Sequence, residues 1–158
     1  MNHIENSEKN TFMETQFLFN QQLSGPYQDI PLRQLTGKLI AGMQTAAVRQ
    51  HSFIVNEISP SIVVTTDENL LATVINNLLA VIVSRNTHSC IKVSAKPFSN
   101  TVLLHIKDQN KSLKETSLGD FKELQGLAAK VGGCITICNQ GRRSSTYAMS
   151  IADLAAVA

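Results

Sequence analysis

Apolar residues recur at helical spacing between Thr65 and Asn86, and this stretch organises the rest of the chain. Thr66 or Asp67 can cap the first turn, and Asp67 and Glu68 place negative charge where the helix dipole favours it. A broad apolar stripe follows and must lie against another part of the protein: Leu70, Leu71, Val74, Ile75, Leu78, Leu79 and Ile82. We therefore predict a packed central helix.

Asn76 and Asn77 interrupt this apolar stripe. Two adjacent amides within an apolar helix are costly unless they are hydrogen-bonded. The simplest interpretation is that one of them faces solvent and the other is satisfied locally.

The same periodicity predicts two further helices. One begins at Pro31, whose fixed φ suits the first turn of a helix, and it continues to about Gln50. Another runs from Phe121 to Val131. The two glycines that follow predict its end, because glycine readily adopts the left-handed backbone that stops a helix.

The remaining ordered segments alternate apolar and polar residues, as half-buried strands do. They are residues 52–58, 62–65, 91–96, 102–106, 134–138 and 147–151, with turns at 59–61, 97–100 and 139–143. Strands buried on both faces are continuously apolar, whereas these are apolar on one side only. The pattern predicts an α+β fold in which helices cover one face of a mostly antiparallel sheet, while the other face meets water or a partner.

Residues 1–24 are predicted to form a separate element, a polar tail followed by a short helix, with one domain over residues 25–158. Such a short helix is marginal alone in water. Its large apolar residues cannot share one narrow stripe, so part of its surface needs a second contact: Phe12, Phe17, Phe19 and Leu23. That contact is either the sheet of the same chain or a second copy, in a homodimer.

Composition narrows the function classes. Hydrophobic residues make up 43% and charged residues 16% of the chain, as in a globular domain. The formal net charge of +2 is too balanced to indicate nucleic acid binding. No apolar run reaches membrane-spanning length and the first ten residues are polar, so we expect a cytoplasmic protein without membrane insertion. Cys90, Cys134 and Cys138 lack Cys-x-x-Cys spacing and are interpreted as reduced thiols.

The central helix resembles the N-box helix of the histidine kinase ATPase domain, part of the GHKL superfamily. The residues that carry this resemblance are Asp67, Leu70 or Leu71, Val74-Ile75 and Asn77-Leu78-Leu79. The chain end VGGCITICNQGRRSSTYAMSIA is similar to the family's His-Gly-Gly-x-Ile-x-Ile hairpin, with Val131 at the histidine. Together with the order of elements, the resemblance covers about residues 27–154 and implies the family's two-layer α/β sandwich.

The family's nucleotide-site residues are only partly present. Asn77 matches the first asparagine of the N-box, but Val81 stands where the family has its magnesium-binding asparagine and Ser84 replaces the lysine. Magnesium demands oxygen ligands, and valine offers none. The resemblance therefore implies the family's fold, whereas these replacements argue against magnesium and nucleotide binding.

Asp108 stands where the Asp-x-Gly-x-Gly segment of the family has the carboxylate that reads adenine. Asn110 and Ser112 replace its glycines; Asn110 is a partial substitute because asparagine tolerates a left-handed backbone. The alternative for Asp108 is an Asx-turn at a strand end. About ten residues separate it from the next helix near Gly119, too few for the family's glycine-rich phosphate cradle.

The resemblance and these losses indicate a nucleotide-free relative of the histidine kinase ATPase domain, which is not an enzyme and needs neither ATP nor Mg²⁺. It would act in two-component-type signalling through protein–protein contacts, with a response regulator or a sensor kinase as partner. Asn77, Asp108 and Asn110 would be vestigial nucleotide-site positions. Three alternatives stay open: an active, ATP-binding catalytic domain of a sensor histidine kinase, a phosphotransfer adaptor that docks a response regulator, and an unrelated α+β binding domain. The adaptor needs an acceptor histidine on a helical hairpin, a context that none of the four histidines has: His3, His51, His88 and His105.

Overall fold

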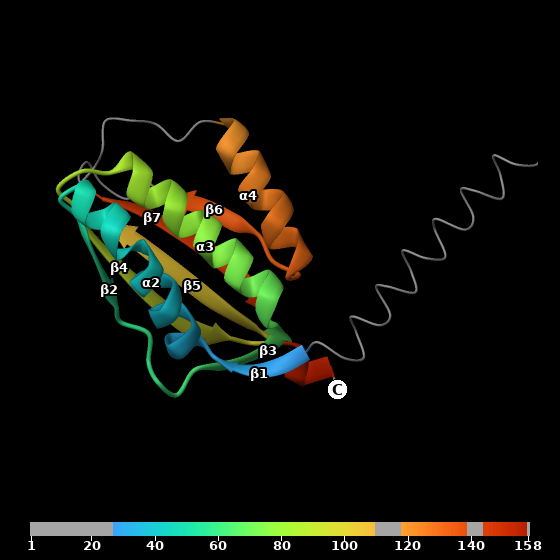
Figure 1. Cartoon of the computed structure of the whole chain (residues 1–158). Coiled ribbons are helices and arrows are strands. Elements are labelled where there is room, and N and C mark those ends of the chain that lie inside the picture. Colours follow the sequence, from blue (N-terminus) through green and yellow to red (C-terminus); the bar gives the residue numbers. More distant parts are fainter. Residues whose placement is uncertain (1–26, 110–117, 139–143, 158) are drawn as a thin grey trace, which may run out of the picture.

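The computed structural model describes residues 27–109, 118–138 and 144–157 (Figure 1). The elements, in chain order, are β1 Tyr27–Pro31, α2 Leu32–Arg49, β2 Phe53–Asn56, β3 Val63–Asp67, α3 Glu68–Arg85, β4 Cys90–Phe98, β5 Thr101–Asp108, α4 Leu118–Lys130, β6 Ile135–Cys138, β7 Ser145–Ala152 and the 3-10 helix η1 Leu154–Val157. The predictions for residues 1–24, Asn110 and Ser112 lie outside the described residues.

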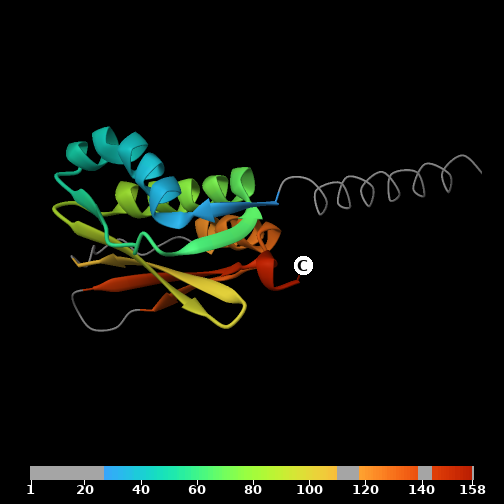
Figure 2. The same cartoon turned by 90° about the horizontal axis from the view of Figure 1, so that it is seen from below.

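Five strands form the main sheet in the order β2-β4-β5-β7-β6. The pair β2–β4 is parallel and the other pairs are antiparallel. The strands β1 and β3 form a separate antiparallel pair. Figure 2 shows the helices on one side of the molecule and the main sheet on the other. The predicted α+β architecture, with a mostly antiparallel sheet covered on one face, is therefore confirmed.

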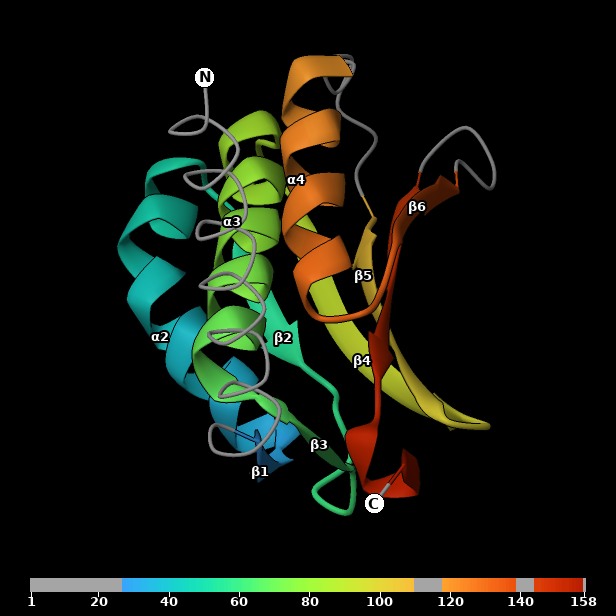
Figure 3. The ribbon, with the colours of Figure 1, turned by 90° about the vertical axis from the view of Figure 1, so that its right-hand side faces the viewer.

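Helix α3 lies between α2 and α4 and forms the centre of the core (Figure 3). Asp67 caps it, because its carboxylate accepts a hydrogen bond from the Leu70 backbone N–H at 3.2 Å. The predicted apolar stripe packs against the inward side chains of the strands, and all of it except the half-buried Leu70 is buried. Large side chains that are fully buried in this core include Leu71, Ile75, Leu78, Leu79, Ile82, Ile91, Leu104, Ile106, Met149 and Ile151.

Some predicted boundaries shift, among them those at Pro31 and at residues 97–100. Pro31 ends β1 with an extended backbone instead of opening the helix, and the first helical residue, Leu32, donates its N–H to the Ile62 carbonyl at 3.1 Å. The predicted turn at 97–100 is shorter, because β4 continues through Pro97 to Phe98. Beyond the Asn56–Val93 pair this side of β4 is an edge, where a residue without an N–H is tolerated.

The glycine pair after α4 ends the helix as predicted. Gly132 has φ +69°, the left-handed conformation that favours glycine. Gly133 lies so close to β7 that an added Cβ would sit 1.7 Å from the Ser150 carbonyl oxygen. Both glycines are thus needed where the chain turns from α4 into β6.

Candidate functional site

Asn77, the residue at the first N-box asparagine, lies on the exposed side of α3. Its side-chain amide donates to the Thr73 carbonyl one turn earlier, at 2.8 Å. Asn76 is exposed as well. The predicted division is therefore confirmed: Asn76 faces solvent and Asn77 is satisfied within its own helix, although its side chain is exposed as well.

Val81 lies one helical turn beyond Asn77 and is half-buried against the core. With Asn77 it lines a cavity of about 60 Å³ between α3 and α4, and Glu123, Leu124 and Leu127 line the same cavity from the α4 side. Pockets that bind ligands of drug size measure roughly 300–1,000 Å³. Among the described lining residues only Glu123 offers a carboxylate, and it is exposed.

Asp108 lies at the end of β5 and is 2% exposed. Its carboxylate accepts a hydrogen bond from the Ser89 hydroxyl, and Ser89 is itself buried. The Ser89 backbone N–H donates to the Ser52 hydroxyl at 3.1 Å, and the Ser89 carbonyl accepts from Phe53 N–H at 3.1 Å. A buried carboxylate requires such partners, so Asp108 helps to join the ends of β5, β4 and β2.

The structure places Asn77 and Asp108, the two described positions that the resemblance assigns to the nucleotide site, in different settings. Asn77 lines the α3–α4 cavity, whereas Asp108 is not among the described residues that line it. Within the described part of the chain, no group of three or more His, Cys, Asp or Glu side chains is arranged to hold a metal ion. No helix in that part is both long enough and apolar enough to cross a membrane.

A larger, open hollow lies on the other side of the helical layer, between α2 and the connection from β2 to β3. It measures about 690 Å³ and is lined by Pro31, Arg33, Gln34, Gly37, Lys38, Ala41, Asn56 and Pro60. Arg33 donates to the Ile58 carbonyl at 2.8 Å, and Asn56 donates to the Arg33 carbonyl at 3.0 Å. These bonds hold the β2–β3 connection against α2. The hollow contains none of the nucleotide-site positions.

His51 and His88 form a contact that the local sequence does not predict. Their rings stack with centroids 4.9 Å apart and planes 5° apart, and both residues have a left-handed backbone, with φ +54° and +52°. Each histidine stands two positions before the paired residues Phe53 and Cys90. Only the parallel pairing of β2 with β4, once known, could have indicated this contact.

Neither protein-family models nor curated proteins give a match to this sequence. Solved structures do. The Acinetobacter baumannii histidine kinase AdeS matches with a TM-score of 0.70 and 18% identity, over 87% of this chain and 73% of that one. A nucleotide-free catalytic domain of the histidine kinase ThkA matches with a TM-score of 0.65 and 12% identity, over 80% and 95% of the two chains.

A third match is ThkA in complex with the response regulator protein TrrA, with a TM-score of 0.62 and 14% identity, over 93% of this chain and 49% of that one. At these identities the likeness concerns the fold. The chain has the fold of histidine kinase catalytic domains, as its N-box-like helix and closing hairpin predicted.

Proposed function

We propose that this protein is a nucleotide-free relative of the histidine kinase ATPase domain, which acts in two-component-type signalling through protein–protein contacts. The observation that carries the proposal is the setting of Val81. This residue takes the place of the family's magnesium-binding asparagine and, with Leu124 and Leu127, lines a cavity of only about 60 Å³. A site for Mg-ATP needs oxygen ligands and several times that volume.

The environment of Asp108 supports the same interpretation. In the family the equivalent carboxylate reads adenine, so its retention here requires another reason if nucleotide is absent. The hydrogen bond from buried Ser89 supplies one, because a carboxylate inside the protein is stabilised by such donors. Asp108 then has a structural role, which accounts for its presence in a protein without a nucleotide site.

The class of partner is proposed from the fold. ThkA, which shares this fold, is described in complex with the response regulator TrrA. We assign to the present chain a partner from the same signalling apparatus, a response regulator or a sensor kinase.

The second candidate is an ATP-binding catalytic domain of a sensor histidine kinase. It is favoured by the presence of both Asn77 and Asp108 at family positions and by the exposure of Asn77 beside the α3–α4 cavity. This candidate requires nucleotide binding, whereas the proposed function excludes it.

Titration calorimetry with Mg-ATP separates the two. Loss of several charge-assisted contacts, each worth about 1.5–3 kcal/mol, should leave a Kd weaker than about 1 mM. Asn77→Ala is the informative variant and Asn76→Ala its matched control, since both amides are exposed on α3. Micromolar binding that Asn77→Ala abolishes and Asn76→Ala preserves would overturn the proposal.

A further inference from the structure

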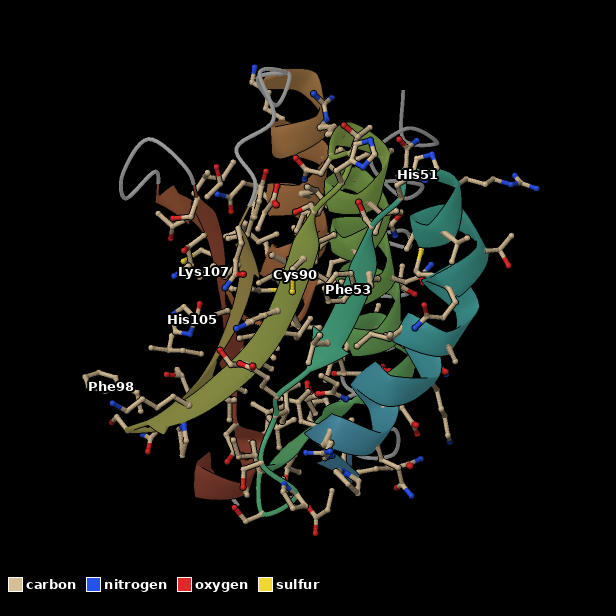
Figure 4. All side chains as sticks on the ribbon, turned by 90° about the vertical axis from the view of Figure 1, so that its left-hand side faces the viewer. His51, Phe53, Cys90, Phe98, His105 and Lys107 are labelled. Carbon is tan, nitrogen blue, oxygen red and sulfur yellow. The ribbon has the colours of Figure 1, made fainter. Side chains whose placement is uncertain are left out.

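No described helix covers the face of the main sheet opposite α2, α3 and α4, here called the open face, and its central strands carry a group of basic side chains. In β4 and β5 the residues that alternate with the buried core point away from the helices. His105 and Lys107 stand on this face on β5, next to β4 (Figure 4). In the register of the two strands, Lys92 faces Lys107 and Ser94 faces His105. Lys96, two positions further along β4, faces Leu103.

The juxtaposition of Lys92 and Lys107 disfavours the sheet, because like charges directly opposite each other repel. Glu57 lies 3.8 Å from the Lys92 ammonium, but both side chains are more than a third exposed, so this ion pair is weak. Within the described residues no carboxylate lies within salt-bridge distance of Lys107 or Lys96. Among the described residues, the face therefore carries more positive than negative charge.

The neighbouring strands leave this charge accessible. Opposite Lys107 and His105, β7 presents Thr146 and Ala148. Opposite Ala148, β6 presents Thr136. These side chains are small and uncharged, so the face is flat beside the basic group and no wall of the described residues covers it.

Two exposed aromatic residues flank the basic group. Phe53, on the edge strand β2, is 56% exposed, and Phe98, where β4 turns into β5, is 65% exposed. They lie toward opposite ends of the face (Figure 4). Aromatic residues of this kind anchor protein–protein interfaces, whereas base stacking needs them in the middle of a sheet, where this face has Ser94 and Ala148.

The size of the face suits a protein partner. Strand β4 has nine residues. The other strands of the sheet have four to eight residues. At about 3.3 Å per residue and about 4.8 Å between strands, the five-stranded face covers roughly 500 Å². Each partner in a standard interface contributes roughly 800 Å², so the face with its flanking aromatic residues is of the same order as one side of such an interface.

We propose that this open face binds an acidic surface of a partner protein. Carboxylates of the partner meet Lys92, Lys107 and Lys96, His105 adds a further donor, and apolar side chains of the partner pack on Phe53 and Phe98. This surface is the one through which the protein–protein contact of the proposed function would be made. The inference rests on the proposed function only because it requires a protein partner.

The probe is a Glu-rich peptide of about 20 residues with two phenylalanines, titrated to about 1 mM against the full isotopically labelled chain and followed by NMR. We expect the amide signals of outward residues on β4 and β5 to shift. Lys107→Glu should weaken binding at least tenfold. The matched control is Lys38→Glu, which makes the same charge change at an exposed position on α2, across the molecule, and should weaken it less than twofold.

Several outcomes would overturn the inference. They are no shift at the highest peptide concentration, equal losses in Lys107→Glu and Lys38→Glu, or shifts that map to the hollow beside α2. Tighter binding of an oligothymidylate to the same strands would assign the face to nucleic acid instead. Mg-ATP binding is measured separately, so this test remains valid even if the protein turns out to bind nucleotide. A peptide that binds elsewhere would exclude the open face as the binding surface, but it would not exclude protein–protein contact as the function.

Discussion

The Ser89 hydroxyl donates a hydrogen bond to the Asp108 carboxylate, and the two side chains are only 1% and 2% exposed. The residue at the family's adenine-reading position is thereby linked to the start of β4. Ser89 is linked in turn to Ser52 before β2, so the bond connects three strand ends that are far apart in the sequence.

The first prediction concerns the strength of this link. Ser89→Ala removes a hydrogen bond to a buried charged group and should lower the free energy of unfolding by about 1.5–3 kcal/mol. The matched control is Ser94→Ala, on the open face of β4, with an expected change within about 0.5 kcal/mol. Urea denaturation of both variants measures the difference. Equal stability of the two would mean that the Asp108 carboxylate does not depend on Ser89.

The secondary structure was largely readable from the sequence because its signals are local. The α3 stripe, the Asp67 cap and the glycine stop after α4 each depend on residues within a few positions of one another. The alternation of apolar and polar residues correctly predicted that one face of the sheet is covered and the other is not, because this alternation can be read within each strand alone.

The strand register was not readable, and most of the surface chemistry depends on it. Lys92 and Lys107 are distant in the sequence and give no basic stripe there, yet the β4–β5 pairing places them opposite each other. The stack of His51 on His88 likewise follows from the β2–β4 pairing. The setting of the two asparagines, by contrast, was readable from local spacing: Asn76 is exposed, and Asn77 is bonded to the Thr73 carbonyl within its own helix.

The second prediction uses two glycines with opposite surroundings. Gly133→Ala would place a Cβ 1.7 Å from the Ser150 carbonyl oxygen, so the turn between α4 and β6 must move. We expect a loss of more than about 4 kcal/mol, in the range that marks a specific structural conflict. Gly126→Ala is the control. It meets nothing within 4 Å on α4 and should raise the stability by up to about 1 kcal/mol.

Thermal unfolding followed by circular dichroism measures both glycine variants. The expected result is a strongly lowered or absent transition for Gly133→Ala and a slightly raised midpoint for Gly126→Ala. A Gly133→Ala variant that unfolds within a few degrees of the natural chain, since 1 kcal/mol corresponds to roughly 2–4 °C at this size, would contradict the close approach of α4's end to β7.

The last prediction separates the stability of the open face from its proposed use. Lys107→Glu replaces the repulsion from Lys92 by an attraction across the β4–β5 ladder, and such pairs contribute about 0.2–1 kcal/mol. The variant should therefore be more stable than the natural chain in urea at low salt, and the gain should shrink in about 1 M NaCl, where the Debye length is about 3 Å. Lys96→Glu is the control, because Lys96 faces Leu103 and not a lysine.

A Lys107→Glu variant that is more stable yet no longer binds the acidic peptide would show that the positive charge at this position favours binding and lowers the stability of the fold. An equal gain in Lys96→Glu, or no gain in Lys107→Glu at low salt, would contradict the direct opposition of the two lysines.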